Sequence, residues 1–271
     1  MAAARDTGGI GASQERYTQG SLPADTQPAG FIDIHHHILW GVDDGPRTQA
    51  DSEAMLALAY AEGTRRIIAT SHFDPLGTCP DVDKLMIKLD TLNALCVERF
   101  PGLSIALGAE ILYNEGIRRK LRSGIIPALA GSDHVLVEFL PSVTAAEMEK
   151  AIRHLANGGF VTIVAHVERY GTIIKAPDTI RHLKGKYGAR FQVNVETLLT
   201  WQGFTLRRYV KHAITEGLID FIASDAHGVE RRRSRLKDVE AFIRRRYGDE
   251  IARRLFYGNA ANLFSLVDNS Y

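Results

Sequence analysis

The chain has 271 residues, 45% of them apolar, and a formal net charge of +1. That length can bury a large core, and the near-neutral balance argues against binding nucleic acid or membranes through an overall field. Two cysteines, Cys79 and Cys96, cannot build a disulfide framework and indicate a cytoplasmic protein with reduced thiols. No run of about 18 apolar residues occurs, so we expect no insertion into a bilayer.

Residues 1–30 differ in composition from the rest of the chain. They are rich in Gly, Ala, Ser, Thr and Gln and contain few large apolar side chains. Such a segment buries too little apolar surface to offset the entropy of ordering. We therefore expect a disordered N-terminal extension over 1–30 and one domain over 31–271.

After residue 30, short apolar runs alternate with longer stretches of helical periodicity. The runs are rich in Ile, Val or Phe, which is typical of buried parallel strands. Predicted strands cover 31–34, 66–70, 104–109, 134–139, 160–166, 190–195 and 220–224.

Helical periodicity follows most of these strands, and several helical stretches stop at a glycine, as helices commonly do. Predicted helices cover 48–62, 81–99, 144–157, 206–216, 236–247 and 249–257. The repeated strand-then-helix order favours an α/β fold with a parallel sheet, closed into a single β/α barrel.

Ionisable side chains stand at the C-terminal ends of nearly all the predicted strands. In a β/α barrel these ends meet at one face, where active sites are built. Crowding carboxylates and imidazoles there is costly unless bound cations compensate. The set comprises His35, His37, His72, Glu110, Glu138, His166, Asp225 and His227.

The spacing of these residues also favours a metal site. His35 and His37 are two residues apart, so on an extended chain both rings point the same way, whereas His36 faces the other side. The donors exceed what one ion needs, and two or three ions sharing a carboxylate fit better. Imidazole and carboxylate ligands without thiolate suit manganese, zinc or iron, and the sequence does not choose among them.

Clustered cations favour hydrolysis of an anionic ester, because they lower the pKa of a bridging water and clamp the ester oxygens. Arg169, three residues after His166, fits a phosphate-binding guanidinium, with an ion pair to a carboxylate as the competing explanation. Cysteine-based phosphatases need an arginine six residues after the cysteine, where this chain has Leu85 and Gly102. The sequence therefore predicts that any phosphatase activity depends on metal.

The motifs DIHxH, VDDGP, TSH, GAE, VEF, VAHxERY and SDAH together resemble the PHP (polymerase and histidinol phosphatase) superfamily. More narrowly, they resemble the bacterial manganese-dependent protein-tyrosine phosphatases of capsule and exopolysaccharide loci. The resemblance runs from Phe31 to the NAANLF segment near the C-terminus, and VDDGP and AHxERY are its most specific parts. It implies a distorted, TIM-like (β/α)₇ barrel, the PHP fold, with three divalent metal ions.

The resemblance also implies a role for individual residues. The first ion would bind His35, His37, Glu110 and Asp225, the second Glu110, Glu138 and His166, and the third His72, His227 and Asp44. Asp43 is a weaker candidate for the third ion. Substrate phosphate would meet Arg169 and one arginine of 231–233, for which Arg232 is the choice. Arg169, Asp225 and His227 would be the catalytic residues.

The implied function is hydrolysis of phosphotyrosine in a protein, by a hydroxide that bridges two ions. The implied partner is a membrane-anchored bacterial tyrosine kinase that controls exopolysaccharide synthesis. One alternative is a PHP phosphoesterase of other specificity, either a small-molecule phosphatase of the histidinol-phosphate type or a nuclease. Another is a metal-stabilised barrel that binds a kinase tail without hydrolysis. Position 36, commonly small or polar in the family, is His here, and the segment after His72 is where related enzymes vary their substrate loop.

Overall fold

The computed structural model describes residues 30–77, 79–200 and 204–264. Apart from Gly30, the predicted extension over 1–30 lies outside the described residues. The strands are β1 (Phe31–His36), β2 (Thr64–Ala69), β3 (His72–Phe73), β4 (Ser104–Leu107), β5 (Glu110–Leu112), β6 (His134–Glu138), β7 (Val161–Val164), β8 (Arg190–Asn194) and β9 (Phe221–Ala223).

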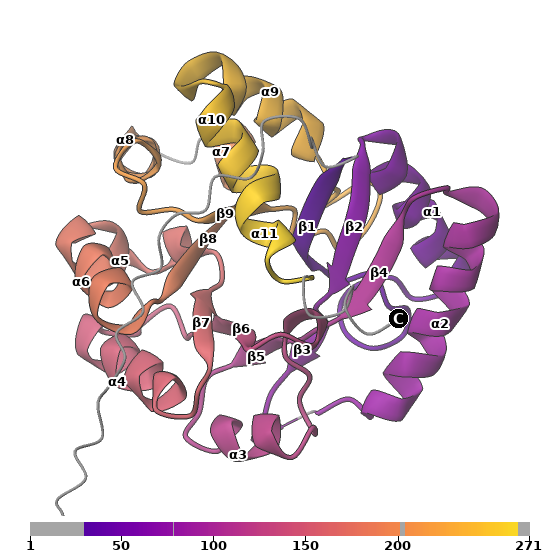
Figure 1. Ribbon diagram of the computed structural model, residues 1–271, viewed down its shortest axis with the longest axis horizontal. Helices are drawn as coiled ribbons and strands as arrows, with labels where there is room; N and C mark the ends of the chain where they lie inside the picture. Colours follow the sequence, from indigo (N-terminus) through magenta and orange to yellow (C-terminus); the bar gives the residue numbers. More distant parts are fainter. Residues whose placement is uncertain (1–29, 78, 201–203, 265–271) are drawn as a thin grey trace, which may run out of the picture.

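These strands form a curled parallel assembly in two sheets (Figure 1). One sheet has the order β1-β2-β4 and the other the order β3-β5-β6-β7-β8-β9. The first and last strands adjoin, because His36 and Ala226 form an isolated parallel bridge. The His37 N–H donates to Ala226 O at 2.9 Å, and the Asp225 N–H donates to His35 O at 2.9 Å. The predicted α/β class with parallel strands is confirmed.

Two of the predicted strands end early and are followed by a short strand that was not predicted. The run at 104–109 is strand only over β4, before β5 begins at Glu110, and the run at 66–70 belongs to β2, which ends at Ala69, before β3 begins at His72. Gly108 lies in the break between β4 and β5, where a Cβ atom would come within 2.7 Å of Ile68 Cγ2 and 2.8 Å of Leu129 Cδ2. The close approach requires glycine, and the strand continues beyond it in the other sheet, with Glu110 as its first residue.

Helices surround the strands on the outside (Figure 1). They are α1 (Gln49–Ala61), α2 (Val82–Arg99), α3 (Ile117–Arg122), α4 (Ala145–Ala156), α5 (Gly171–Ile174), α6 (Pro177–Tyr187), α7 (Val195–Thr200), α8 (Phe204–Thr215), α9 (Leu236–Tyr247), α10 (Asp249–Arg253) and α11 (Asn259–Ala261). A π-helical turn at Arg254–Gly258 follows α10, so the helix predicted over 249–257 changes its pitch partway.

Local signals explain where these helices begin and end. Thr48 and Thr144 form capping boxes with Asp51 and Glu147 at the starts of α1 and α4. The sequence analysis did not predict α6, although it has a proline in its first turn and ends at Gly188, which has a φ of 70°. Within the residues that the structure describes, no helix is both long and apolar enough to cross a membrane.

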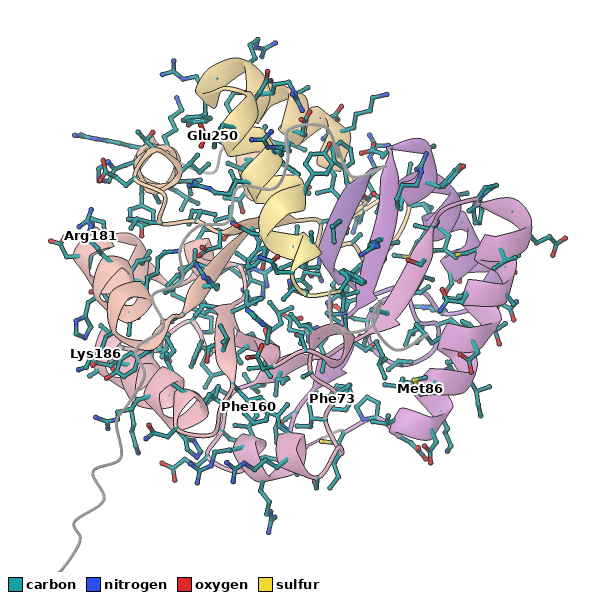
Figure 2. The ribbon with its side chains drawn as sticks, in the orientation of Figure 1. Phe73, Met86, Phe160, Arg181, Lys186 and Glu250 are labelled. Carbon is teal, nitrogen blue, oxygen red and sulfur yellow. The ribbon has the colours of Figure 1, made fainter. Side chains whose placement is uncertain are left out.

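The apolar core has two parts. The larger part lies between strands and helices and includes Phe73, which is buried, whereas Arg181 and Glu250 lie at the periphery (Figure 2). The smaller part is built from strand residues such as Ile34 and Ile163 and from residues at the end of the described chain. This packing fixes the strand ends that carry the ionisable residues.

Candidate metal centre

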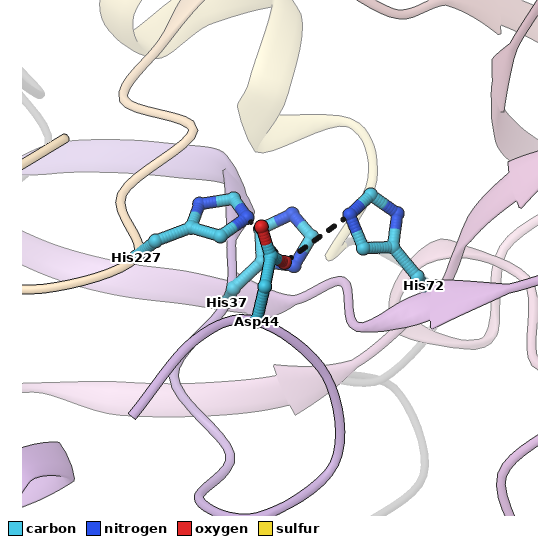
Figure 3. Close-up of side chains that lie close together, drawn as sticks. All are labelled: His37, Asp44, His72 and His227. Atoms are coloured by element: carbon cyan, nitrogen blue, oxygen red, sulfur yellow. Dashed lines mark ion pairs between the residues drawn. The ribbon is translucent and has the colours of Figure 1, made fainter. Parts of the chain in front are cut away.

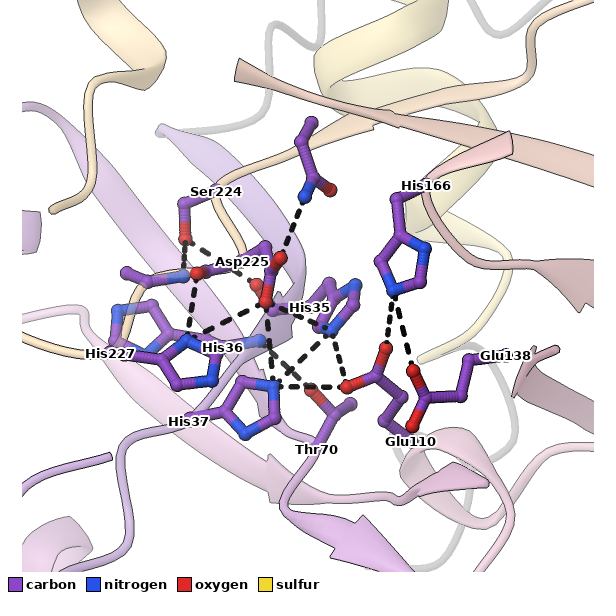
Figure 4. A network of polar contacts seen from close by, with 12 residues as sticks. His35, His36, His37, Thr70, Glu110, Glu138, His166, Ser224, Asp225 and His227 are labelled. Carbon is purple, nitrogen blue, oxygen red and sulfur yellow. Dashed lines mark hydrogen bonds and ion pairs between the residues drawn. The ribbon is translucent and has the colours of Figure 1, made fainter. Parts of the chain in front are cut away.

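Four side chains converge at the end of β1, the start of β5 and the segment that follows β9 (Figure 4). The Nε2 atoms of His35 and His37 are 3.3 Å apart. Each lies 3.2 Å from Glu110 Oε2, and they lie 3.4 and 3.5 Å from Asp225 Oδ1. Four donors placed about 2.1 Å from one ion at the corners of a tetrahedron are about 3.4 Å apart. The donor atoms therefore already have the spacing that a tetrahedral metal site requires.

Glu110 also faces a second group of donors. Its other oxygen, Oε1, lies 2.7 Å from His166 Nε2, and His166 Nε2 lies 3.8 Å from Glu138 Oε2. His72 Nδ1 lies 3.1 Å from Glu110 Oε2 and 3.4 Å from Glu138 Oε1. The two oxygens of Glu110 thus face different partners, as a bridging carboxylate does, and His72 reaches this group as well.

A third group is formed by His37, Asp44, His72 and His227, whose ligand atoms lie within 4.8 Å of one another (Figure 3). Asp44 Oδ1 is 3.1 Å from His227 Nε2 and 3.5 Å from His72 Nε2. The rings of His37 and His227 stack with their centroids 3.7 Å apart. The structure therefore brings all nine of the predicted ligand residues into one cluster.

Hydrogen bonds orient the two histidines of the first group. His37 Nδ1 is 2.9 Å from Asp43 Oδ2, and His35 Nδ1 is 3.2 Å from Gln192 Oε1. When Nδ1 carries the proton and donates it to these oxygens, the Nε2 lone pair is free for a cation. Asp43, considered in the sequence as a weaker ligand, instead supports His37 and accepts the backbone N–H of His72 at 3.0 Å.

Gln192 and Asn194 connect the first group internally, and the sequence analysis did not predict a role for Gln192. Gln192 Nε2 donates to Asn194 Oδ1 at 2.7 Å, and Asn194 Nδ2 donates to Asp225 Oδ2 at 2.6 Å. Gln192 Oε1 also accepts the backbone N–H of His166 at 2.8 Å. The sequence signal for these two roles was that Gln192 and Asn194 are polar residues at alternating positions of strand β8, so both point to the same face.

Backbone strain is concentrated at this cluster. His166, Asp225 and Arg232 have φ values of 32°, 52° and 49°. Among the described residues, the only other non-glycine residue with positive φ is Ala130. Such conformations are costly and tend to occur at functional sites, where the surrounding structure enforces them.

Two arginines border the cluster. Arg169 Nη2 donates to Asp225 Oδ2 at 2.8 Å. This contact is the ion pair with a carboxylate that the sequence offered as an alternative to phosphate binding. Arg232 Nη2 donates to Asp225 Oδ1 at 2.8 Å, and its Nη1 donates to Asp44 Oδ2 at 3.3 Å. Arg232 is thus the arginine of the 231–233 run that contacts the cluster. Both guanidinium groups are partly exposed and can exchange carboxylate for phosphoryl oxygens.

The protonation of the histidines reflects the surplus of acidic oxygens. Burial opposes the charging of His35, but Glu110 and Asp225 outweigh it and raise the pKa of His35 to about 9. Burial likewise opposes charging at His72, but hydrogen bonds to Glu110 and Glu138 raise its pKa to about 11. In the absence of metal, protons thus supply positive charge that cations would otherwise bring.

Some nearby residues remain outside the three groups. His36 is fully buried, and neither ring nitrogen has a hydrogen-bond partner in the described part of the chain. Glu168 accepts the N–H of Asn194 and the hydroxyl of Thr197, both at 3.0 Å. Neither residue belongs to one of the ligand groups.

The fold and the site together define a class of α/β proteins that gather candidate metal ligands at the carboxyl ends of parallel strands. Within that class, the chain belongs to the family described as capsular polysaccharide synthesis, CpsB/CapC, whose family model matches residues 31–265. The family that the sequence motifs suggested is thereby confirmed.

Several known proteins are similar to this chain. The tyrosine-protein phosphatase CpsB of Streptococcus agalactiae serotype III (strain NEM316) is 29% identical over 246 residues, covering 89% of this chain and 100% of the relative. The tyrosine-protein phosphatase YwqE of Bacillus subtilis (strain 168) is 29% identical, covering 82% of this chain and 87% of the relative.

A solved structure is also similar over most of its length. It comes from the crystal structures of YwqE from Bacillus subtilis and CpsB from Streptococcus pneumoniae, described as metal-dependent tyrosine phosphatases. The match has a TM-score of 0.78 and 29% identity, and it covers 86% of this chain and 94% of that chain.

Proposed function

We propose that this protein is a metal-dependent protein-tyrosine phosphatase. The observation that carries the proposal is the tetrahedral spacing of the four buried donors of His35, His37, Glu110 and Asp225. The named relatives, which are tyrosine-protein phosphatases, supply the reaction and the substrate class.

Three divalent ions are proposed as cofactors, with manganese as the first to test and zinc or iron as alternatives. The proposed ligand sets are His35, His37, Glu110 and Asp225; then Glu110, Glu138 and His166; and then His72, His227 and Asp44. When bound, such ions lower the pKa of water and neutralise phosphoryl oxygens. Contacts of His37 and His72 with more than one group support a shared, multinuclear cluster.

The two arginines are proposed to bind the phosphate of the substrate. Arg169 and Arg232 now donate to the same carboxylate, Asp225. A phosphoryl group bound at the exposed side of the cluster would present anionic oxygens that accept the same hydrogen bonds as the carboxylate of Asp225. Asp225 and His227 remain the other proposed catalytic residues, at the junction between the ligand groups and the arginines.

The remaining proposals concern the organisation and setting of the protein. We propose a distorted (β/α)₇ barrel of the PHP type over 31–271, with 1–30 as an extension. The bridge that brings the ends of β1 and β9 together supports this closed arrangement. The family's description as capsular polysaccharide synthesis supports a substrate in that process, for which we propose a membrane-anchored tyrosine kinase. We propose that the phosphatase itself acts in the cytoplasm.

Phosphate release from a phosphotyrosine peptide, measured together with the metal content of the same sample, tests the function. We expect turnover with Mn²⁺ and its loss with a chelator. Preferential turnover of histidinol phosphate or single-stranded DNA would favour the other PHP specificities. Absence of hydrolysis in excess manganese would favour a binding protein.

The arginine assignment has its own test. We expect Arg169→Ala to lower kcat/KM for the peptide about a hundredfold, because a charge-assisted bond to the phosphoryl group is lost. Metal content should stay unchanged, since the guanidinium group of Arg169 stays protonated and has no lone pair to donate to an ion. Loss of metal from this variant would show that Arg169 is part of the metal site.

A further inference from the structure

Three neighbouring loops border one side of the cluster. They follow β3, β5 and β6, the strands that carry His72, Glu110 and Glu138. β3 pairs with β5, and β5 pairs with β6, so the three loops leave adjacent strands at the same edge. The described residues of the loops are 74–77 and 79–81, 113–116, and 139–144.

Each loop presents an apolar or aromatic side chain within four residues of its candidate ligand. Leu76 is 87% exposed and Leu140 is 63% exposed. Tyr113 lies between them along the sheet and is partly exposed, and its ring stacks on Phe139 with centroids 5.6 Å apart. We refer to Leu76, Tyr113 and Leu140 as the apolar wall. Large side chains this exposed, beside a candidate active site, are typical of a binding surface.

Hydrogen bonds hold two of the loops to their neighbouring elements. The backbone N–H of Tyr113 donates to Glu138 O at 3.0 Å, which connects the second loop to β6. Lys120 of α3 donates to Pro75 O at 2.7 Å, which connects α3 to the first loop. These bonds fix where the first and second loops leave the sheet.

The three loops differ from the arginine side in having no arginine of their own. Their charged residues are Asp74, Asp81 and Glu115. Of these, Glu115 is paired with Lys150 at 2.7 Å, and Lys120 Nζ donates to Pro75 O in the first loop. The cationic groups that contact the cluster, Arg169 and Arg232, come from the segments after β7 and β9. The two sides thus suit different parts of one substrate: a phosphate at the arginines, and uncharged, apolar groups at the wall.

We propose that the apolar wall binds the side chains that flank the phosphotyrosine of a protein substrate and selects apolar flanks over acidic ones. This inference rests on the proposed function and adds the substrate feature that it leaves open. Apolar flanking side chains gain by covering Leu76 and Leu140. Acidic flanking side chains lose hydration against Leu76 and Leu140 and gain no apolar contact in return.

The test compares two phosphotyrosine peptides of equal length with Mn²⁺ present, one flanked by Leu and Val and the other by Asp and Glu. We expect kcat/KM to favour the apolar peptide about tenfold. In the double variant Leu76→Ser, Leu140→Ser, the ratio should fall to about two or less. The control is Val97→Ser, because Val97 is 83% exposed on the last turn of α2 and lies outside the wall. It should keep the full preference.

The outcomes separate this inference from the proposed function. A wild-type protein that hydrolyses neither peptide nor para-nitrophenyl phosphate contradicts the phosphatase assignment. A wild-type protein that hydrolyses both peptides equally contradicts the wall alone. Retention of the tenfold preference by the double variant, with an unchanged melting temperature, also overturns the role of Leu76 and Leu140.

Discussion

The first and third donor groups differ in how they meet solvent. His35, His37, Glu110 and Asp225 are almost completely buried, and hydrogen bonds fix their orientation. In the third group, by contrast, the side chain of His72 is 37% exposed and that of Asp44 is 61% exposed. The comparison teaches that one group is a preformed interior site, while the other is an open site that substrate can reach. The predictions below test this difference.

Removing a ligand of the buried group should have the largest effect. Asp225 lies within 3.5 Å of both His35 and His37 and also binds both arginines. We expect Asp225→Ala to reduce turnover of a phosphotyrosine peptide by about a thousandfold or more, because ligand and positioning contacts disappear together. Circular dichroism should show a folded protein, and activity within tenfold of wild type would contradict the assignment.

Removing a ligand of the open group should have a smaller effect. Asp44 contacts His72, His227 and Arg232 at the surface of the cluster. We expect Asp44→Ala to lose one ion per chain and to lower kcat/KM about ten- to a hundredfold. Elemental analysis checks the stoichiometry. Loss of all bound metal would mean that the two groups do not differ as proposed.

The orienting contact of His37 offers a subtler test of the buried group. Asp43→Asn keeps the size of the side chain but removes the charge that holds the Nδ1 proton of His37. Loss of such supporting contacts typically lowers metal affinity ten- to a hundredfold. Metal titration followed by calorimetry should show this weakening. An unchanged affinity would remove Asp43 from the account of how the site is organised.

The pH dependence of metal binding should reveal which imidazoles an ion has to deprotonate. Without metal, the pKa of His35 is raised to about 9, so at pH 7 its ring carries a proton that an ion must displace. In the third group His227, with a pKa lowered to about 4 by burial and by the neighbouring His37, is already neutral, whereas His72 is protonated because, despite its burial, contacts with Glu110 and Glu138 raise its pKa to about 11. Apparent affinity of the buried group should therefore rise by about tenfold per pH unit for each displaced proton between pH 6 and 8.

Calorimetry at pH 7 in buffers of different ionisation enthalpy measures this proton release directly. The expected result is release of at least one proton per chain as the buried group fills. Metal binding without proton release, or affinity that falls as the pH rises, would contradict the charge balance described for His35.

The sequence allowed most of the strands, and the residues that gather at the cluster, to be predicted, because strand composition and strand-end position are local properties. The break at Gly108 was not predictable, since it depends on contact with Ile68 and Leu129. The bond between His35 and Gln192 joins residues 157 positions apart, and its geometry follows only from the folded sheet. The choice of Arg232 within three consecutive arginines depends on a backbone turn with φ of 49°.

Glu110 directs one oxygen toward His35 and His37 and the other toward His166. If both groups bind ions as proposed, the first ion to bind fixes the side chain of Glu110 in the rotamer that the second ion requires. Half-filled molecules would then be scarce, and activity would climb more steeply with manganese concentration than a single hyperbola allows. A phosphatase built this way would switch on over a narrow range of metal concentration.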